Sequence, residues 1–339
     1  GGQGNDRITN NGLITLGPQA TTSGQTVGVS AIGAAINDAN ATSYATATGL
    51  DGGRDRDTII NNSTIDATAS STATAKSTGV VIGGYSLNQA NTTAHAEAIG
   101  IDGGDEDDAL LNADAGSIVI VADAQVFSKS LTISVLGDAS GEANTTAEST
   151  ATGLRGGTGD DAIANRRDVT VSATASGNSA GASIGLFGST QASAASTVDA
   201  VATGIDGGDG EDVIDNDADI DVGASTIADA SSLSLNLGGA GEADAGARAM
   251  ALAIGIAGGG DGDDITNRGH ITAFSEASAF AVSETGGLAG DAQGNASTEA
   301  TAMAYGIEGG SAADYLYNGN DVTVHAKSFA QALSASSVL

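Results

Sequence analysis

The sequence predicts an all-β protein with a β-solenoid fold, similar in architecture to a parallel β-helix. Two observations carry this prediction. A module of about 51 residues is repeated about seven times, and residues between the repeated turns are sorted with a period of two. Each module contains the pattern Asp-x-(Ile/Leu)-x-Asn, whose Asp recurs at spacings of 51, 51, 53, 51, 51 and 51 residues. A fixed period of this length is typical of proteins in which each repeat packs only on its neighbours.

The repeated turns begin near residues 1, 52, 103, 156, 207, 258 and 309. We therefore expect residues 1–339 to form a single elongated repeat array rather than separate domains. The chain begins inside a turn and stops within a module, so we expect it to be a segment of a longer repeat protein.

The composition predicts a thin core and a need for counter-ions. The chain has 51 Gly and only 3% aromatic residues, and Ala is the commonest residue in its 40% hydrophobic content, so opposing layers must approach closely. Its net charge of −31 argues against nucleic acid and anionic membranes as partners, because both are bound through Lys and Arg. It has no Cys and no apolar run long enough to insert into a membrane as a helix.

Strands account for the residues between turns. In residues 169–175, Val and Ala alternate with Thr and Ser, which is the pattern of a half-buried strand. Helix is disfavoured because the sorting has period two and not 3.6. The two extra residues of the third module fall within 113–117, where we expect a loop.

The strand that returns to each turn has only Ala or Ser at alternate positions, so we predict that this face lies inside. We also predict that the opposed sheets are closer than the usual spacing of about 10 Å. The small positions are Ala45, Ala47, Ala96, Ala98, Ser149, Ala151, Ala200, Ala202, Ala251, Ala253, Ala302 and Ala304. The intervening positions vary and are assigned to the outer face, among them Ile99, Thr152 and Thr203.

A second glycine recurs midway between the acidic turns and predicts a second turn or bulge. This position requires a positive φ or a close approach of two backbones. The glycines concerned are Gly33, Gly84, Gly137, Gly188, Gly239 and Gly290.

The acidic turn resembles the nonapeptide Gly-Gly-x-Gly-x-Asp-x-(apolar)-x of the RTX calcium-binding β-rolls. The full match stands at 1–6, 156–161 and 207–212. Copies at 52, 103 and 258 carry Asp or Glu in place of the third Gly, and the copy at 309 is degenerate. The resemblance covers about ten residues per module, and RTX rolls repeat the motif in tandem, whereas this chain has one copy per module. The Ala-rich strands look like those of bacterial surface β-helix proteins.

The RTX resemblance implies Ca²⁺ bound between stacked turns by backbone carbonyls and Asp carboxylates. The physics agrees, because carboxylates stacked at the strand spacing of about 4.8 Å repel unless a hard cation intervenes. We therefore predict Ca²⁺ as the cofactor, held by Asp6, Asp55, Asp57, Asp105, Asp108, Asp160, Asp161, Asp209, Asp212, Asp261, Asp263 and Asp314.

Two alternatives to this calcium site remain open at the level of sequence. The carboxylates could simply be solvated in ordinary Asp-Gly turns. A module could also contain two coils, which would place like turns too far apart to share ions; we favour one coil per module. The Asn four residues after each motif Asp predicts a hydrogen-bonded Asn ladder with a structural role.

The residues favour a structural role and not an enzyme. The repeat carries no Ser/His/Asp constellation, phosphate loop or Cys/His cluster, and its symmetry is broken by only one small insertion. We predict an extracellular, calcium-stabilised filament or rod on a microbial cell surface. The alternatives are the stalk of a large adhesin and a surface that binds polysaccharide or ice. We expect self-association, either head to tail or laterally through an apolar patch of Met250, Leu252, Ile254, Met303 and Tyr305.

Overall fold

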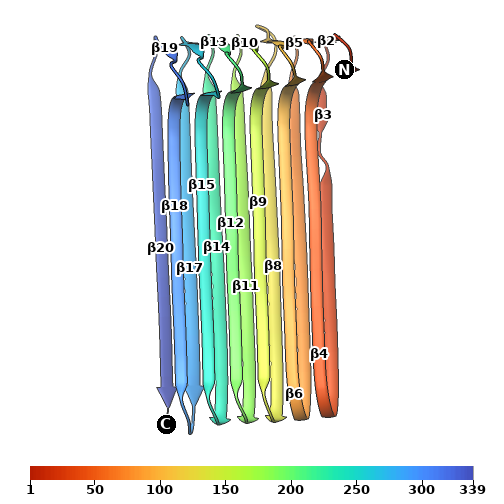
Figure 1. The fold of residues 1–339 in the computed structure, drawn as a ribbon, viewed down its shortest axis with the longest axis vertical. Helices are drawn as coiled ribbons and strands as arrows, with labels where there is room; N and C mark the ends of the chain where they lie inside the picture. The colour runs from red at the N-terminus through yellow and green to blue at the C-terminus, as the bar shows by residue number, and fades with distance from the viewer. Residues whose placement is uncertain (339) are drawn as a thin grey trace.

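The computed structural model describes residues 1–338, which form β-strands and no helix (Figure 1). Each coil has an outgoing arm, a glycine tip, a returning arm, the acidic turn and a short third strand. The outgoing arms are β3 (Ile14–Leu16), β8 (Ile118–Leu136), β11 (Val169–Phe187), β14 (Ile220–Gly238), β17 (Ile271–Gly287) and β20 (Val322–Val338).

The returning arms are β9 (Ala139–Thr158), β12 (Thr190–Asp209), β15 (Gly241–Gly259) and β18 (Ala292–Gly310). In β4 (Gln19–Arg54) and β6 (Ile65–Asp105), one strand continues through the tip and forms both arms, so the two layers belong to one folded sheet of 13 strands. The third strands form a second sheet of seven: β2 (Arg7–Asn10), β5 (Thr58–Asn61), β7 (Ala109–Asn112), β10 (Ala162–Asn165), β13 (Val213–Asn216), β16 (Asp264–Asn267) and β19 (Tyr315–Asn318). The short β1 (Gly2–Gln3) pairs with β4.

Neighbouring coils pair in parallel and in register at the repeat spacing. Val169 of β11 pairs with Ile220 of β14 on one side and with Ile118 of β8 on the other. Each module is therefore one coil, and like positions stack at the strand spacing of about 4.8 Å. The strands run along the longest axis of the molecule, so this stretch is a flat slab whose coils stack across its width (Figure 1).

The core has two parts of different thickness. At the acidic-turn end, the three strands of a coil surround a prism filled by Ile, Leu and Val, exemplified in one coil by Leu154, Ile163 and Val169, each at most 1% exposed. Along the rest of the slab only two layers face each other, and their buried side chains are mostly Ala and Ser. The composition thus predicted the thin part, but the thick apolar prism was not anticipated.

In the thin part, hydroxyl groups of one layer bond directly to the backbone of the other. Ser130 Oγ donates to the carbonyl of Asn88 at 2.9 Å, and Ser275 Oγ donates to that of Ala251 at 2.8 Å. Because a Ser side chain plus one hydrogen bond spans only about 5 Å, the layers lie far closer than in an ordinary sandwich. A methyl group built on Gly181 would lie 2.2 Å from the carbonyl oxygen of Ser193, so glycine is required there.

The predicted faces are confirmed along both arms, with one exception. Ala200 and Ala202 are buried, and the Val and Ala positions of 169–175 are buried as expected. However, Ile99, Thr152 and Thr203, predicted outside, are at most 6% exposed. The strict alternation ends there. The next residue is a glycine (Gly100, Gly153 and Gly204), and both this glycine and the apolar residue after it are also buried.

Both predicted turns are present. The tip glycines have positive φ, such as 120° at Gly137; Gly239 is the exception, but a methyl group there would lie 1.9 Å from the Gly188 carbonyl oxygen. The insertion at 113–117 is a loop between β7 and β8, closed by a hydrogen bond from Gly116 N–H to the Ala113 carbonyl.

Candidate functional site

The predicted Asn ladder is present at the end of the short strands. Each side-chain amide donates to the amide oxygen of the next coil, as in Asn112 to Asn165 and Asn165 to Asn216, at 2.8 and 2.7 Å. The six links are unbroken from Asn10 to Asn318. The ladder therefore joins all the coils, and its role is structural.

The motif Asp residues form a second ladder inside the acidic turn. The backbone N–H of each donates to Oδ1 of the Asp in the next coil, as in Asp108 to Asp161 at 2.7 Å and Asp161 to Asp212 at 2.8 Å. The same bond repeats along the whole column, from Asp6 to Asp314. The second oxygen, Oδ2, is buried without a hydrogen-bond partner in Asp6, Asp57, Asp108, Asp161, Asp212 and Asp263.

Each column Asp lies against the first glycine of its own turn. A methyl group on Gly156 would lie 2.4 Å from Oδ2 of Asp161 and 2.3 Å from the carbonyl oxygen of Gly207. The second glycine of the turn has positive φ in every module, for example 118° at Gly157. These two requirements explain the Gly-Gly pair: one glycine makes room for the carboxylate, and the other makes the turn.

Burial makes the carboxylates in the middle of the column costly to ionise. Burial raises the pKa of Asp161 to about 7, and the negative charges of Asp212 and Asp108 add to this against the opposing Asp108 N–H bond. In the same way, burial raises the pKa of Asp108 and of Asp212 to about 6. The middle of the column is therefore a line of desolvated carboxyl groups whose charged form is disfavoured.

The remaining predicted ligands lie on the outside of the turn and divide between two roles. Asp55 and Asp160 accept backbone N–H bonds from the adjacent coil, from Gly4 at 2.9 Å and from Glu211 at 3.0 Å. Asp105 pairs loosely with Arg54 at 3.7 Å. Asp209 and Asp261 are both exposed on the surface of the turn.

Asp107 belongs with this set and was missed by the sequence prediction. Its Oδ1 accepts the N–H of Asp160 at 3.1 Å, and its carboxylate also pairs with Arg56. It occupies the same repeat position as Asp160, so the repeat phase alone was a signal that could have identified it.

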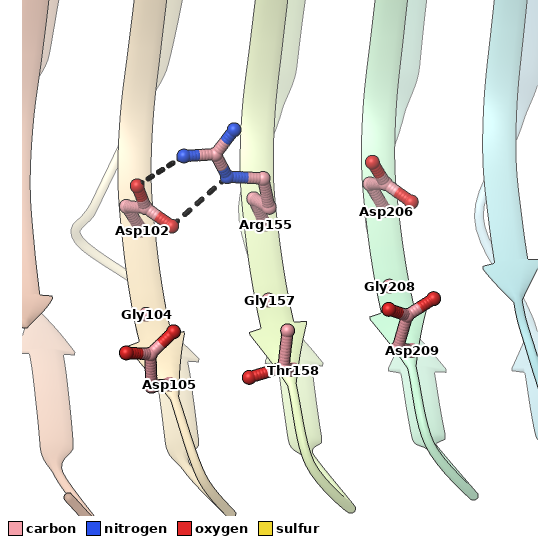
Figure 2. Close-up of a pocket in the computed structure, with 9 residues that line it drawn as sticks. All are labelled: Asp102, Gly104, Asp105, Arg155, Gly157, Thr158, Asp206, Gly208 and Asp209. Carbon is pink, nitrogen blue, oxygen red and sulfur yellow. Dashed lines mark hydrogen bonds and ion pairs between the residues drawn. The ribbon is translucent and has the colours of Figure 1, made fainter. Parts of the chain in front are cut away.

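A shallow groove of about 400 Å³ runs beside the turns on the outer surface (Figure 2). Arg155 spans to Asp102 of the preceding coil through Nε–Oδ1 and Nη2–Oδ2 contacts of 3.0 and 2.5 Å. Asp206 lies on the other side of Arg155, and burial raises its pKa while Arg155 opposes the rise. With Asp105 and Asp209 also lining it, the groove holds four carboxyl groups and one guanidinium, and this excess of acid suits a cation.

Basic side chains elsewhere also bridge coils. Arg268 Nη1 contacts Asp215 at 2.5 Å and Asp217 at 2.9 Å, and Arg248 pairs with Glu299 at 3.4 Å. In these pairs each Arg meets a carboxylate one coil away. In total, seven of the eleven Lys and Arg side chains join neighbouring coils by ion pairs.

The acidic column fits calcium in its donor chemistry, but not through side chains alone. Within residues 1–338, no three Asp, Glu or His side chains form a group that could hold a metal ion by themselves. In-register stacking repeats each Oδ2 at about 4.8 Å, which is about twice the 2.3–2.6 Å length of a Ca–O bond. An ion there would use the buried Oδ2 atoms and turn carbonyls, and it would supply the positive charge that the column lacks.

The predicted apolar patch on the returning arms is only partly exposed. Tyr305 is exposed, whereas Met250, Leu252, Ile254 and Met303 are half-buried. Residues 1–338 contain no helix long and apolar enough to cross a membrane. The chain matches no known protein-family model, no characterised protein and no solved structure in the comparisons made.

Proposed function

We propose that the chain is a structural segment of an extracellular filament or rod on a microbial cell surface, stabilised by calcium in its acidic turns. One observation carries the proposal: every coil from the first to the sixth contributes a carboxylate whose buried Oδ2 has no partner. A catalytic site would need one or two such groups at one place. A charge repeated in every coil serves the whole array.

The repeated polar side chains support a structural role because they bond coil to coil. The Asn ladder and the Asp ladder both run in one direction, from donor in one coil to acceptor in the next. Any number of coils can be added under the same rule, as in other solenoids. The stiffness of the rod would then be set by the bonding between neighbouring coils, and its length by the number of coils.

Calcium is the favoured ion because hard oxygen donors are the only ligands that the turn offers. Calcium accepts carboxylate and carbonyl oxygens in flexible geometry, while magnesium demands a near-ideal octahedron. Sites with one carboxylate per turn are weak, in the range of about 10⁻⁴–10⁻³ M typical of extracellular modules. They would fill only outside the cell, which supports the proposed location.

The test is a thermal melt followed by circular dichroism in EDTA, in millimolar calcium and in equal magnesium. At about 10 mM calcium, which is ten to one hundred times the expected dissociation constant, an ion that binds only the folded chain stabilises it by about 1.4–2.7 kcal/mol per site. We expect calcium to raise the midpoint clearly and magnesium to raise it little. An identical midpoint in EDTA and calcium would refute the calcium role, and electron microscopy of the native material would test the filament separately.

A further inference from the structure

The edge of the slab opposite the acidic turns is apolar. Large side chains project at the glycine tips, and each of the six tips has at least one. Ile32 is 91% exposed and Phe187 is 57% exposed. The exposed large side chains one or two positions before a tip glycine, called here the tip ridge, are Ile32, Ile82, Leu136, Leu186, Phe187, Leu237 and Leu288.

Register places these side chains in a line along the stack. In the position before the tip glycine, Ile32 pairs with Gly83, Gly83 with Leu136, and Leu136 with Phe187, which pairs with Gly238. At this position the ridge therefore has gaps at Gly83 and Gly238, and Leu136 and Phe187 project side by side between them. A second ridge of the same kind can place its projections against those gaps.

The ridge is also the least charged part of the molecule. The ten-residue segments around the tips, 28–37, 79–88, 132–141, 183–192, 234–243 and 285–294, contain three acids, Asp138, Glu242 and Asp291, and no base. The chain as a whole has 42 acids. The acidic turns lie at the other end of arms of 19 residues, or about 63 Å.

We propose that a second copy of this chain docks on the tip ridge, so that two slabs join edge to edge with their acidic turns pointing outward. Charge favours this arrangement over any other self-contact. Repulsion between surface charges fades beyond a Debye length of about 8 Å at physiological salt, and the tip contact keeps the acidic edges far beyond it. A contact through the turns or the groove would bring carboxylates together.

A second copy also suits the shape better than a lipid surface does. No Lys or Arg lies near the ridge to offset repulsion between an anionic membrane and a chain of charge −31. The ridge is narrow, and insertion deep enough to hold it would bury the polar neighbours Asp138 and Ser189. A matching ridge covers the apolar line and leaves those side chains in water.

The size of the ridge predicts a weak, reversible contact. Six tips at the strand spacing extend over about 24 Å, so each copy would bury roughly 300–400 Å², below the ~800 Å² per partner of a stable complex. The expected dimer therefore dissociates in the micromolar to millimolar range. The inference does not rest on calcium or on the proposed function, and it assigns lateral contacts to the tips and not to the half-buried patch around Leu252.

Sedimentation of the full chain in EDTA, from about 1 μM to about 1 mM, tests the proposal over the range in which a contact of this size dissociates. We expect a monomer–dimer equilibrium, weakened at least tenfold by the double variant Leu136→Ser/Phe187→Ser. The matched control Phe127→Ser/Ile227→Ser removes two apolar side chains of comparable exposure from the outgoing arms and should leave the equilibrium unchanged. Circular dichroism confirms that all three proteins are folded.

The proposal would be overturned if the wild-type chain stayed monomeric over the whole concentration range. It would also be overturned if the ridge variant and the control variant weakened dimerisation equally. A monomer that floats with phosphatidylcholine vesicles only when the ridge is intact would overturn it too, because the ridge would then bind lipid. A second readout uses the absence of native Cys. Leu136→Cys should form disulfide-linked dimers on mild oxidation, whereas Val213→Cys, exposed at the acidic end, should not.

Discussion

Replacing Asp161 by Asn tests whether the buried acidic column destabilises the fold in the absence of calcium. The carboxyl is 2% exposed and its Oδ2 has no partner. Its pKa rises from 3.8 to about 7 on folding, so the folded chain binds a proton that the unfolded chain releases. Stability from this group is therefore fully present below pH 3.8 and is lost as the pH rises through about 7.

The magnitude follows from the shift. About three pKa units correspond to roughly 4 kcal/mol of stability lost between acid and pH 8. Asn keeps an oxygen to accept the Asp108 N–H and removes the charge, but its NH₂ enters a site without an acceptor, which costs roughly 1–3 kcal/mol. In EDTA at pH 8 we expect Asp161→Asn to be more stable than wild type by roughly 1–3 kcal/mol.

The assay is a set of melts at pH 4, 6 and 8, with EDTA or calcium. At pH 4 the wild-type carboxyl is protonated, so the advantage of Asn should vanish or reverse. Calcium at pH 8 should stabilise the wild type more than the variant, because the variant has lost one anionic ligand. The surface change Asp221→Asn, at an exposed position outside the acidic turn, controls for net charge. A wild type that gains stability in EDTA from pH 4 to pH 8, or a variant destabilised equally at every pH, would refute the reasoning.

Three further outcomes test the packing. Ala202→Leu should destabilise by roughly 1–3 kcal/mol or more because it overpacks the thin core, and Val201→Leu on the outer face should be nearly neutral; equal effects would mean that the faces are inverted. Gly181→Ala should destabilise by a similar amount, since its methyl group meets the Ser193 carbonyl, while Gly223→Ala, with open space around it, should not; denaturation midpoints compare the pair. Asn165→Ala should lower the free energy of unfolding by roughly 2–5 kcal/mol, because it leaves two buried ladder groups without partners. Thermal melts measure this, and an unchanged stability would show that the ladder does not stabilise the fold.

The sequence predicted the repeat geometry because each coil meets the same surroundings. Stacking in register requires like residues at like positions, so the recurrence of Asn165 and its equivalents already indicated a ladder. The requirement for a small side chain at Ala202, and for glycine at the tips, likewise follows from local backbone and packing constraints. These features occur once in each module, and their recurrence makes them detectable in the sequence.

The fine structure of the acidic turn could not be predicted in this way. Sequence spacing placed Asp160 and Asp161 together as ligands, yet the structure buries one and leaves the other on the surface capping a neighbouring coil. The turn conformation decides this, through positive φ at Gly157 and Gly159. The groove of Arg155 and Asp206 likewise depends on which substitutions stack next to each other.

The sequence by itself determined the fold class, the single coil per module that it favoured, the inward face of each arm and the ladder residues, because these follow from a period of two inside a period of 51. Only the tertiary structure decided where the core is thick and where it is thin, which carboxyl oxygens lose water without gaining a partner, and that the tips form an apolar edge with few charges. Those properties depend on distances between segments far apart in the module. A pattern of residues along one strand does not fix how closely another strand packs against it.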